Sequence, residues 1–320
     1  MPDVIEPFEI AIPQADLLDL RDRLSRTRWP DRETVADVSQ GPRLDKIRAL
    51  VDYWRDGYDW RRCEAMLNGL GQHRTVLDGL GIHFLHIRSP EPNAMPLIMT
   101  HGWPGSVIEF HKVIGPLTDP ASHGGDRRDA FHLVIPSLPG FGFSDKPTVT
   151  GWGIPRVADA WIALMDRLSY QRWGAQGGDW GAAVTSVIGY KQPEGCVGIH
   201  LNFVMYQPTP EEAADVTPKE KAMLDGISYY QNMLSGYAKL RSTRPQTIAY
   251  SLADSPVGQA AWMYPLFQDV SDSGGNAESA FTYDEMIDDI MLYWLTNSGR
   301  RLPACTGKDS PQCLGRHRPG

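Results

Sequence analysis

The sequence predicts an α/β fold built around a parallel β-sheet that is buried on both faces. From residue 96 onward, short apolar runs alternate with glycine-rich turns and with segments of helical periodicity, a pattern typical of βαβ units. With 320 residues, 42% of them hydrophobic and 22% charged, the chain can bury a large core in one or two domains. We therefore expect a globular protein and not a disordered or fibrous one.

Residues 1–92 are predicted to form an N-terminal domain of their own. A strand over 7–12 precedes a helix that Pro13 opens, because proline is favoured in the first turn of a helix. An apolar stripe and two oppositely charged pairs, each spaced four residues apart, indicate that this helix is amphipathic. The stripe is Leu17, Leu20 and Leu24, and the pairs are Asp19 with Arg23 and Asp22 with Arg26. Further helices are expected near 44–54 and 60–70, and strands over 75–78 and 82–88.

Residues 93–205 are predicted to contain the parallel sheet, and residues 206–298 a helical lid. The core strands are expected at 96–100, 131–136, 172–176 and 197–203. Between the second and third of these, residues 155–168 carry apolar side chains at helical spacing. After residue 205 the strand pattern ends and the sequence becomes helical and rich in Met, Tyr and Trp. Such an insertion after several parallel strands is the basis for predicting a lid.

The charge balance and the cysteines argue against several classes of function. The chain has 39 acidic and 31 basic residues, a net charge of −8, which offers no footprint for nucleic acid or for a membrane surface. The cysteines form no C-x-x-C pair and fit neither a zinc site nor a secreted disulfide framework. The first residues lack the basic and apolar regions of a leader peptide, and no stretch approaches a run of about 18 apolar residues, so we expect neither a leader nor a spanning helix. We expect a cytoplasmic protein without a membrane anchor and leave its oligomeric state open.

The segment Gly177-Gly178-Asp179-Trp180-Gly181 has the pattern of a nucleophile elbow. In the usual G-x-S-x-G form, small flanking residues allow a strained turn between strand and helix to expose one side chain. Here the central residue is Asp179, whose carboxylate can attack an alkyl electrophile directly and form an ester. The alternative is a glycine-rich connection in which Asp179 only caps the next helix.

A second segment, His101-Gly102-Trp103-Pro104-Gly105-Ser106, directly follows the first core strand. At this place the architecture supplies one backbone amide of an oxyanion hole, here that of Trp103, and Trp180 after the nucleophile would supply the other. Each such donor typically contributes about 3 kcal/mol to stabilising an oxyanion. For His101 itself we expect a role in supporting the loop and not in the chemistry.

Taken together, these motifs resemble the epoxide hydrolases of the α/β-hydrolase fold. The resemblance includes 101–106, 136–144 and 177–181, and the N-terminal segment with Arg28-Trp29-Pro30 is similar to the microsomal-type branch. It continues through lid segments at 235–237, 244–247 and 254–258 and covers residues from about 5 to 298.

The resemblance implies a mechanism and a substrate class. Asp179 would open an apolar epoxide to a covalent ester, while Tyr237, at the family's lid-tyrosine position, would donate to the ring oxygen. Water would then hydrolyse the ester to a diol with help from a histidine and an orienting acid. No metal or organic cofactor is implied. Tyr237 could otherwise be a packing aromatic, since Tyr229 and Tyr230 lie nearby.

The last 22 residues depart from the family pattern. The second lid tyrosine, the orienting acid and the base histidine would all follow residue 298, but the chain continues there with a basic tail over 299–320. Five basic residues and one acidic residue give this tail a net charge of +4. We interpret it as a shifted reading frame, the rival being a genuine basic tail. We give its one histidine, His317, no catalytic role, and the other histidines are expected to be surface or packing residues.

Two consequences are expected if the C-terminal part of the core is lost. The chain as written would form the Asp179 ester without hydrolysing it efficiently. The strand at 197–203 would lack a neighbour, which favours aggregation. Two other functions remain as alternatives to an epoxide hydrolase, namely a haloalkane dehalogenase-like enzyme and a non-catalytic binding remnant. A serine hydrolase is the least favoured, because the chain contains no G-x-S-x-G.

Overall fold

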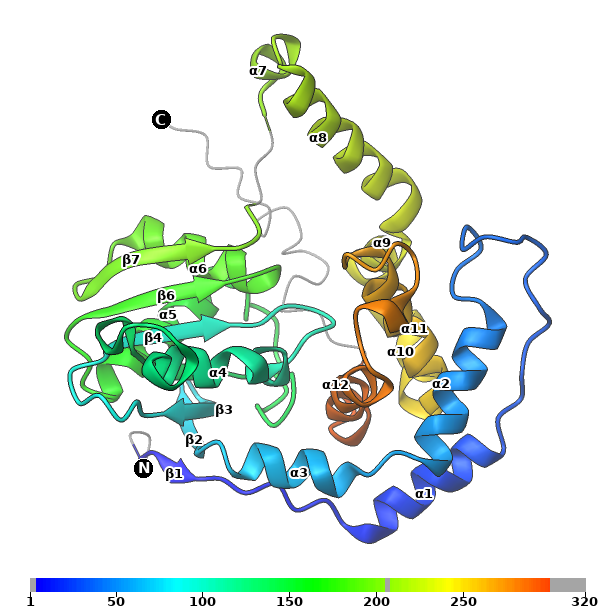
Figure 1. The fold of residues 1–320 in the computed structure, drawn as a ribbon, viewed down its shortest axis with the longest axis horizontal. Helices are drawn as coiled ribbons and strands as arrows, with labels where there is room; N and C mark the ends of the chain where they lie inside the picture. Colours follow the sequence, from blue (N-terminus) through cyan, green and yellow to red (C-terminus); the bar gives the residue numbers. More distant parts are fainter. Residues whose placement is uncertain (1–3, 205–207, 300–320) are drawn as a thin grey trace.

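The computed structural model describes residues 4–204 and 208–299, so the predicted tail from residue 300 lies outside the described residues. Its centre is a seven-stranded sheet with the order β1-β2-β3-β5-β4-β6-β7 (Figure 1). The strands are β1 Glu6–Pro7, β2 Gln72–Leu77, β3 Leu80–Ile87, β4 Met95–Thr100, β5 Phe131–Pro136, β6 Trp173–Gly177 and β7 Cys196–Leu201. The four predicted core strands are therefore confirmed, each to within two residues at either end.

The sheet is mixed: the four predicted core strands are parallel, as expected, and strands from the predicted N-terminal unit extend it. Strands β5, β4, β6 and β7 run parallel, whereas β1, β2 and β3 extend the same sheet in antiparallel fashion. A tight turn joins β2 to β3, because Asp78 and Gly79 both take positive φ angles, 48° and 75°. Strands from the predicted N-terminal unit thus complete the core sheet. The division of the chain at residue 92 stays a prediction.

The first strand is much shorter than the six residues predicted. Only Glu6–Pro7 pair with β2 as a ladder. The Phe8 amide still donates to the Gln72 carbonyl at 3.0 Å, but from Ile10 onward the backbone bonds to side chains. Asn68 accepts from the amide of Ile10 and donates to its carbonyl, each at 2.8 Å. The Glu64 carboxylate accepts from the amide of Ile12, also at 2.8 Å. These side-chain partners satisfy the backbone without a ladder.

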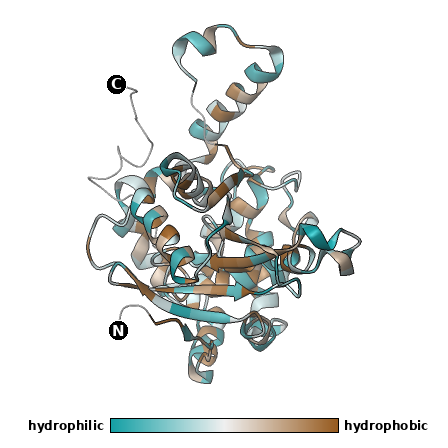
Figure 2. Ribbon diagram, turned by 90° about the vertical axis from the view of Figure 1, so that its left-hand side faces the viewer, coloured by the Kyte–Doolittle hydropathy of each residue, from teal (hydrophilic) through white to brown (hydrophobic). Residues whose placement is uncertain are grey.

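Of the helices before β7, α4, α5 and α6 pack on the sheet, and α1, α2 and α3 belong to the N-terminal part of the chain. Helix α1 (Gln14–Ser25) buries Leu20 and Leu24, with the predicted Asp19–Arg23 and Asp22–Arg26 ion pairs on its outer face. Figure 2 shows apolar stretches on the strands and on the helix faces around them. The others are α2 Leu44–Asp56, α3 Trp60–Asn68, α4 His111–Thr118, α5 Ile154–Arg167 and α6 Trp180–Lys191. Their bounds agree with the helices predicted near 44–54, 60–70 and 155–168.

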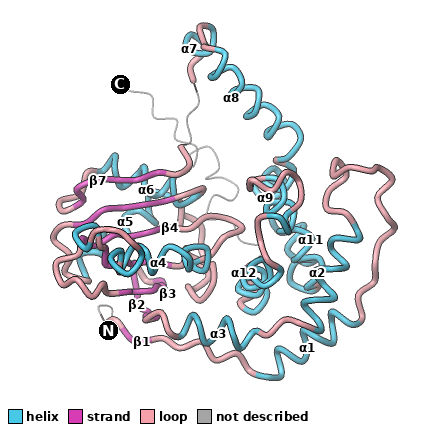
Figure 3. The backbone as a smooth tube through the Cα atoms, in the orientation of Figure 1, coloured by secondary structure: helices cyan, strands magenta, loops and turns pink. Residues whose placement is uncertain are grey.

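The described residues after β7 are helical, as predicted for the lid. Helices α11 and α12 lie beside α2 (Figure 3) and pack on the N-terminal helices, α11 on α1 and α2 and α12 on α2 and α3. Helices α7 and α8 instead protrude from the body, and none of their residues is buried (Figures 1 and 2). The bounds are α7 Pro210–Ala214, α8 Pro218–Tyr229, α9 Gly236–Thr243, α10 Pro245–Asp254, α11 Pro256–Asp269 and α12 Tyr283–Leu295. Within the described ranges, no helix is long and apolar enough to span a membrane.

Strand β7 pairs only with β6 in the described part of the chain, so one of its edges is open. Val197 and Ile199 on this strand are 50% and 42% exposed, and Phe203 just beyond it is 52% exposed. An open strand with apolar side chains can pair with another chain. This edge is the most apolar exposed part of the sheet.

Candidate active site

The predicted elbow is present between β6 and α6. Asp179 has φ 49° and ψ −122°, a strained backbone conformation for a residue other than glycine. Gly177 and Gly181 make this turn possible, because a Cβ atom on Gly177 would overlap the carbonyl of Gly181, and one on Gly181 would overlap the carbonyl of Thr100. The glycines therefore let strand and helix approach closely enough to present Asp179.

The two predicted amides both point at the Asp179 carboxylate. Trp103 donates its backbone N–H to Oδ1 at 2.8 Å, and the Trp180 amide is a second donor. The side chain of Asp179 remains exposed, as a nucleophile must be, yet the protein packed around it raises its pKa. The two amides and Arg241 oppose this shift by stabilising the carboxylate.

The loop 101–106 that carries Trp103 is tied down from two sides. His101 accepts from the amide of Leu138 at 3.0 Å through Nε2, while Nδ1 lies 2.9 Å from the Gly102 carbonyl. The ring is fully buried, and burial lowers its pKa to about 4. Both ring nitrogens are thus engaged within loops, which supports the structural role expected for His101.

Helix α12 holds the other side of the same loop. Ser106 donates to Asp289 at 2.7 Å, and Tyr293 donates to the Gly105 carbonyl at 2.6 Å. Burial raises the pKa of Asp289 to about 8. The adjacent Asp288 faces the N-terminal helices, where Tyr58 in the connection before α3 and Arg62 of α3 donate to it at 2.6 and 2.7 Å. Helix α12 therefore connects the loop 101–106 to the N-terminal helices.

Tyr237 reaches this site from lid helix α9. Its ring stacks on Trp103 with a centroid distance of 5.0 Å and an interplanar angle of 25°. Its hydroxyl lies 2.6 Å from that of Tyr230. Burial and this hydrogen bond raise the pKa of Tyr237, so the phenol is protonated at neutral pH and can donate. The structure thus brings Asp179, Trp103, Trp180 and Tyr237 together.

Three further residues at the site were not singled out from the sequence. The first is Tyr230, whose hydroxyl contacts that of Tyr237. Arg241, one helical turn after Tyr237, has its guanidinium carbon 3.9 Å above the Trp103 ring. Glu109 accepts from the Gly102 amide, and burial and the nearby Asp289 and Asp179 raise its pKa. The i, i+4 spacing from Tyr237 was the one sequence signal that could have pointed to Arg241.

No hydrogen bond of a described histidine goes to Asp179. His83, for example, is fully buried between Ser137 and Gln72, each 2.9 Å from one ring nitrogen. Burial lowers its pKa to about 3. His317 lies outside the described residues. In the described ranges there is also no cluster of three or more metal-binding side chains.

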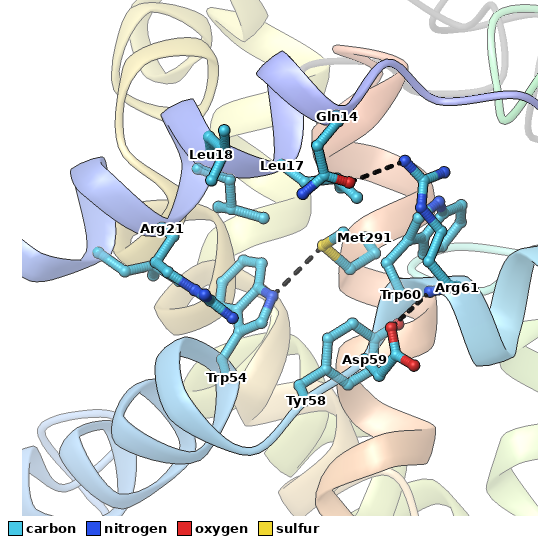
Figure 4. A pocket seen from close by; sticks show the side chains of 12 residues that line it. Gln14, Leu17, Leu18, Arg21, Trp54, Tyr58, Asp59, Trp60, Arg61 and Met291 are labelled. Atoms are coloured by element: carbon cyan, nitrogen blue, oxygen red, sulfur yellow. Dashed lines mark hydrogen bonds between the residues drawn. The ribbon is translucent and has the colours of Figure 1, made fainter.

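A cavity of about 140 Å³ lies elsewhere, between α1, α3 and α12 (Figure 4). Leu17, Trp54 and Met291 line it, with Trp54 Nε1 3.3 Å from the Met291 sulfur. None of the residues around Asp179 takes part in it. Its lining belongs to the packing of the N-terminal helices on α12, so we assign it no part in the chemistry.

An elbow between strand and helix, with two backbone amides directed at its central side chain, is typical of an α/β-hydrolase-fold enzyme. Two family models match, "Epoxide hydrolase N terminus" over residues 5–110 and "alpha/beta hydrolase fold" over residues 95–221. A "Putative epoxide hydrolase" of Stigmatella aurantiaca is 57% identical over 92% of this chain and 67% of its own length. Epoxide hydrolase 1 of Oryctolagus cuniculus is 33% identical over 92% of this chain and 70% of its own length. The chain belongs to the epoxide hydrolase family.

Solved structures of this family have the same fold. The juvenile hormone epoxide hydrolase of Bombyx mori superposes with a TM-score of 0.86 at 28% identity, covering 97% of this chain and 79% of its own. The Aspergillus niger epoxide hydrolase gives a TM-score of 0.85 at 28% identity, covering 97% and 80%. The α/β-hydrolase fold predicted from the sequence is thereby confirmed.

Proposed function

We propose that Asp179 opens an apolar epoxide by direct attack. An Asp179 carboxylate oxygen forms a bond to a ring carbon, the bond from that carbon to the ring oxygen breaks, and its electron pair stays on the oxygen. Tyr237 donates a proton to this oxygen. The products of this half-reaction are an Asp179 ester and a free hydroxyl group on the neighbouring carbon.

The observation that carries this proposal is the position of Trp103. Its backbone amide binds Asp179 at 2.8 Å, while its ring stacks on Tyr237. One residue, Trp103, therefore contacts both the proposed nucleophile and the proposed proton donor. Positioning of this kind supplies a large share of many enzymatic rate enhancements.

The second half-reaction adds water to the carbonyl of the ester. The amides of Trp103 and Trp180 would stabilise the resulting oxyanion. Collapse of the intermediate releases the diol and restores the Asp179 carboxylate, and the proton lost by the water returns to the Tyr237 phenolate. Activation of the water requires a base, and none of the described histidines is bonded to Asp179. We propose that the described residues support ester formation much better than ester hydrolysis.

Incubation with styrene oxide, followed by intact-protein and peptide mass spectrometry, tests both parts. We expect one equivalent of adduct on Asp179 that persists, and no adduct in Asp179→Asn. Asp215→Asn, an exposed change in the connection after α7, serves as the control and should label normally. Sustained diol formation would contradict the proposed arrest at the ester. Labelling that survives Asp179→Asn would contradict the assignment of the nucleophile, and binding without any adduct would indicate a non-catalytic protein.

A further inference from the structure

Two buried donor groups beside Asp179 have no acceptor in the described part of the chain. The first is Arg241, which is fully buried and whose Nε, Nη1 and Nη2 atoms have no hydrogen-bond partner there. The second is the indole Nε1–H of Trp103, a residue that is 5% exposed. The two side chains are in contact, since the guanidinium carbon lies 3.9 Å from the centre of the Trp103 ring.

An arginine in this state is costly unless something pairs with it. Taking a cation out of water without hydrogen bonds is among the most unfavourable events in folding. Arg62 shows the usual solution, because the Asp288 carboxylate accepts from it with both oxygens at 2.7 Å. Arg241 instead lies against the face of Trp103 and is favoured electrostatically by Tyr293, Tyr237 and Asp179, but none of these accepts a hydrogen bond from it in the described part of the chain.

We propose that Arg241 and the indole of Trp103 bind a carboxylate carried by the epoxide substrate. The inference rests on the proposed function and adds a substrate class to it, namely epoxides with an acidic group near the ring. The planar guanidinium can donate two parallel hydrogen bonds to a carboxylate, and the indole donates a third. Asp179 would then attack a ring whose position is fixed by its own carboxylate.

The charges around the site are compatible with an anionic substrate. Burial raises the pKa of Asp289 to about 8, so this group is mainly protonated at neutral pH, and burial also raises the pKa of Glu109. Arg241 keeps its proton, because its lowered pKa is still about 9. The negative charge of the Asp179 carboxylate and the positive charge of Arg241 therefore compensate each other. A neutral epoxide would leave the guanidinium without acceptors, whereas a carboxylate supplies them.

The first arm of the test measures binding without chemistry. 3-Phenylpropanoate and its neutral amide are titrated by calorimetry into the unmodified chain and into Arg241→Gln, Arg241→Lys and Trp103→Phe. We expect the carboxylate to bind at least tenfold more tightly than the amide, and this preference to be lost in Arg241→Gln. Arg241→Lys should keep part of it, because the charge remains. Lys239→Gln removes a cation from the exposed side of the same helix and should leave the preference unchanged.

The second arm measures the rate of Asp179 labelling by trans-3-phenylglycidate and by its methyl ester. The ratio of the two rates should fall about tenfold or more in Arg241→Gln and by a smaller factor in Trp103→Phe. Because each variant is compared with itself, differences in the reactivity of the two epoxides cancel. A ratio that Arg241→Gln leaves unchanged, or equal slowing of both epoxides, would overturn the proposal.

The two arms separate this inference from the proposed function. If no epoxide labels Asp179, the proposed function fails, but the calorimetric preference for the carboxylate still decides the role of Arg241. Should Arg241→Gln lose its near-ultraviolet circular dichroism, Trp103→Phe and Arg241→Lys carry the decision. Equal binding of acid and amide by the unmodified, folded chain would refute the carboxylate site.

Discussion

At the scale of single residues, Asp179 satisfies two opposing requirements. Attack requires the carboxylate to be charged, whereas the protein around it favours the neutral acid and raises its pKa. The amides of Trp103 and Trp180, together with the charge of Arg241, restore part of the preference for the charged form. The pH at which Asp179 becomes reactive therefore reports on this whole arrangement.

We predict that labelling of Asp179 requires a higher pH than an ordinary aspartate would. The reactive form is deprotonated and the pKa is raised, so the rate should fall on acidification with an inflection above about 4, the usual value for aspartate. Arg241→Gln removes a charge that lowers this pKa, and should move the inflection to higher pH. Rates of adduct formation between pH 4 and 8 measure both; an inflection at or below the ordinary value would contradict the prediction.

Replacement of the lid tyrosine should slow ring opening. Tyr237→Phe keeps the stacking on Trp103 but removes the donor, so we expect labelling by styrene oxide to slow about a hundredfold. Tyr229→Phe is the matched control, because that side chain is 59% exposed and lies on the preceding helix. Equal rates for Tyr237→Phe and the unmodified chain would remove Tyr237 from the mechanism.

Asp179, Trp103 and Trp180 could be predicted because each lies in a short motif whose spacing reflects a local backbone geometry. Tyr237 required the family resemblance, since nothing local distinguishes it from Tyr230. Arg241 and Glu109 could not be predicted. Their importance comes from burial against residues far away in the sequence, and a charged residue in a helix is ordinarily solvated.

At the scale of secondary-structure elements, the close contact between β6, α6 and β4 explains the glycines of the elbow. Gly181→Ala should lower the free energy of unfolding by about 3 kcal/mol, because the new methyl group would overlap the Thr100 carbonyl. Gly198→Ala in β7 is the control, since no heavy atom lies within 4 Å of the position that its new methyl group would occupy, and should cost less than about 1 kcal/mol. Urea unfolding measures both; similar losses would argue against the steric explanation.

The contact between α12 and the loop 101–106 should make the free energy of unfolding depend on pH. The pKa of Asp289 is raised to about 8 by burial in the folded chain, against about 3.9 in an unfolded chain. Folding therefore binds a proton between these values, and stability falls as the pH rises, by about 1.4 kcal/mol per pH unit from this group.

Asp289→Asn removes the titrating group and should flatten this dependence. Urea unfolding at pH 5, 6 and 7 gives the slope for the unmodified chain, for Asp289→Asn and for the exposed control Asp272→Asn. We expect the control to follow the unmodified chain. A slope that Asp289→Asn does not change would mean that Asp289 is already ionised in the folded state.

The positions of most elements followed from periodicity, but their partners did not. Strand β5 was predicted with its observed bounds, because an apolar run between turn signals is visible locally. The pairing of β3 with β5 joins segments about fifty residues apart and leaves no local trace. The length of β1 was overestimated for a related reason. The side chains of Asn68 and Glu64 bind the amides of Ile10 and Ile12 in place of a neighbouring strand, and these residues are more than fifty positions apart in the sequence.

At the scale of the whole molecule, the open edge of β7 should govern association. Val197→Lys places a charge on this edge, and we expect it to reduce self-association of the 320-residue chain without lowering stability by more than about 0.5 kcal/mol. Light scattering over a concentration series measures the effect. Val149→Lys, at a 68% exposed loop position, separates the edge from the general benefit of added charge. An equal gain from both variants would exclude β7 as the cause.

The neighbouring carboxyl groups of α12 point in two directions, Asp288 to the N-terminal helix α3 and Asp289 to the loop that positions Trp103. Helix α12 thus connects the N-terminal helices to the loop 101–106. A different N-terminal segment could therefore not replace this one on its own during evolution. It would also need a matching α12 to hold the loop 101–106 in place. We expect substitutions in α3 and α12 to have accumulated together, as they do between two permanently bound subunits.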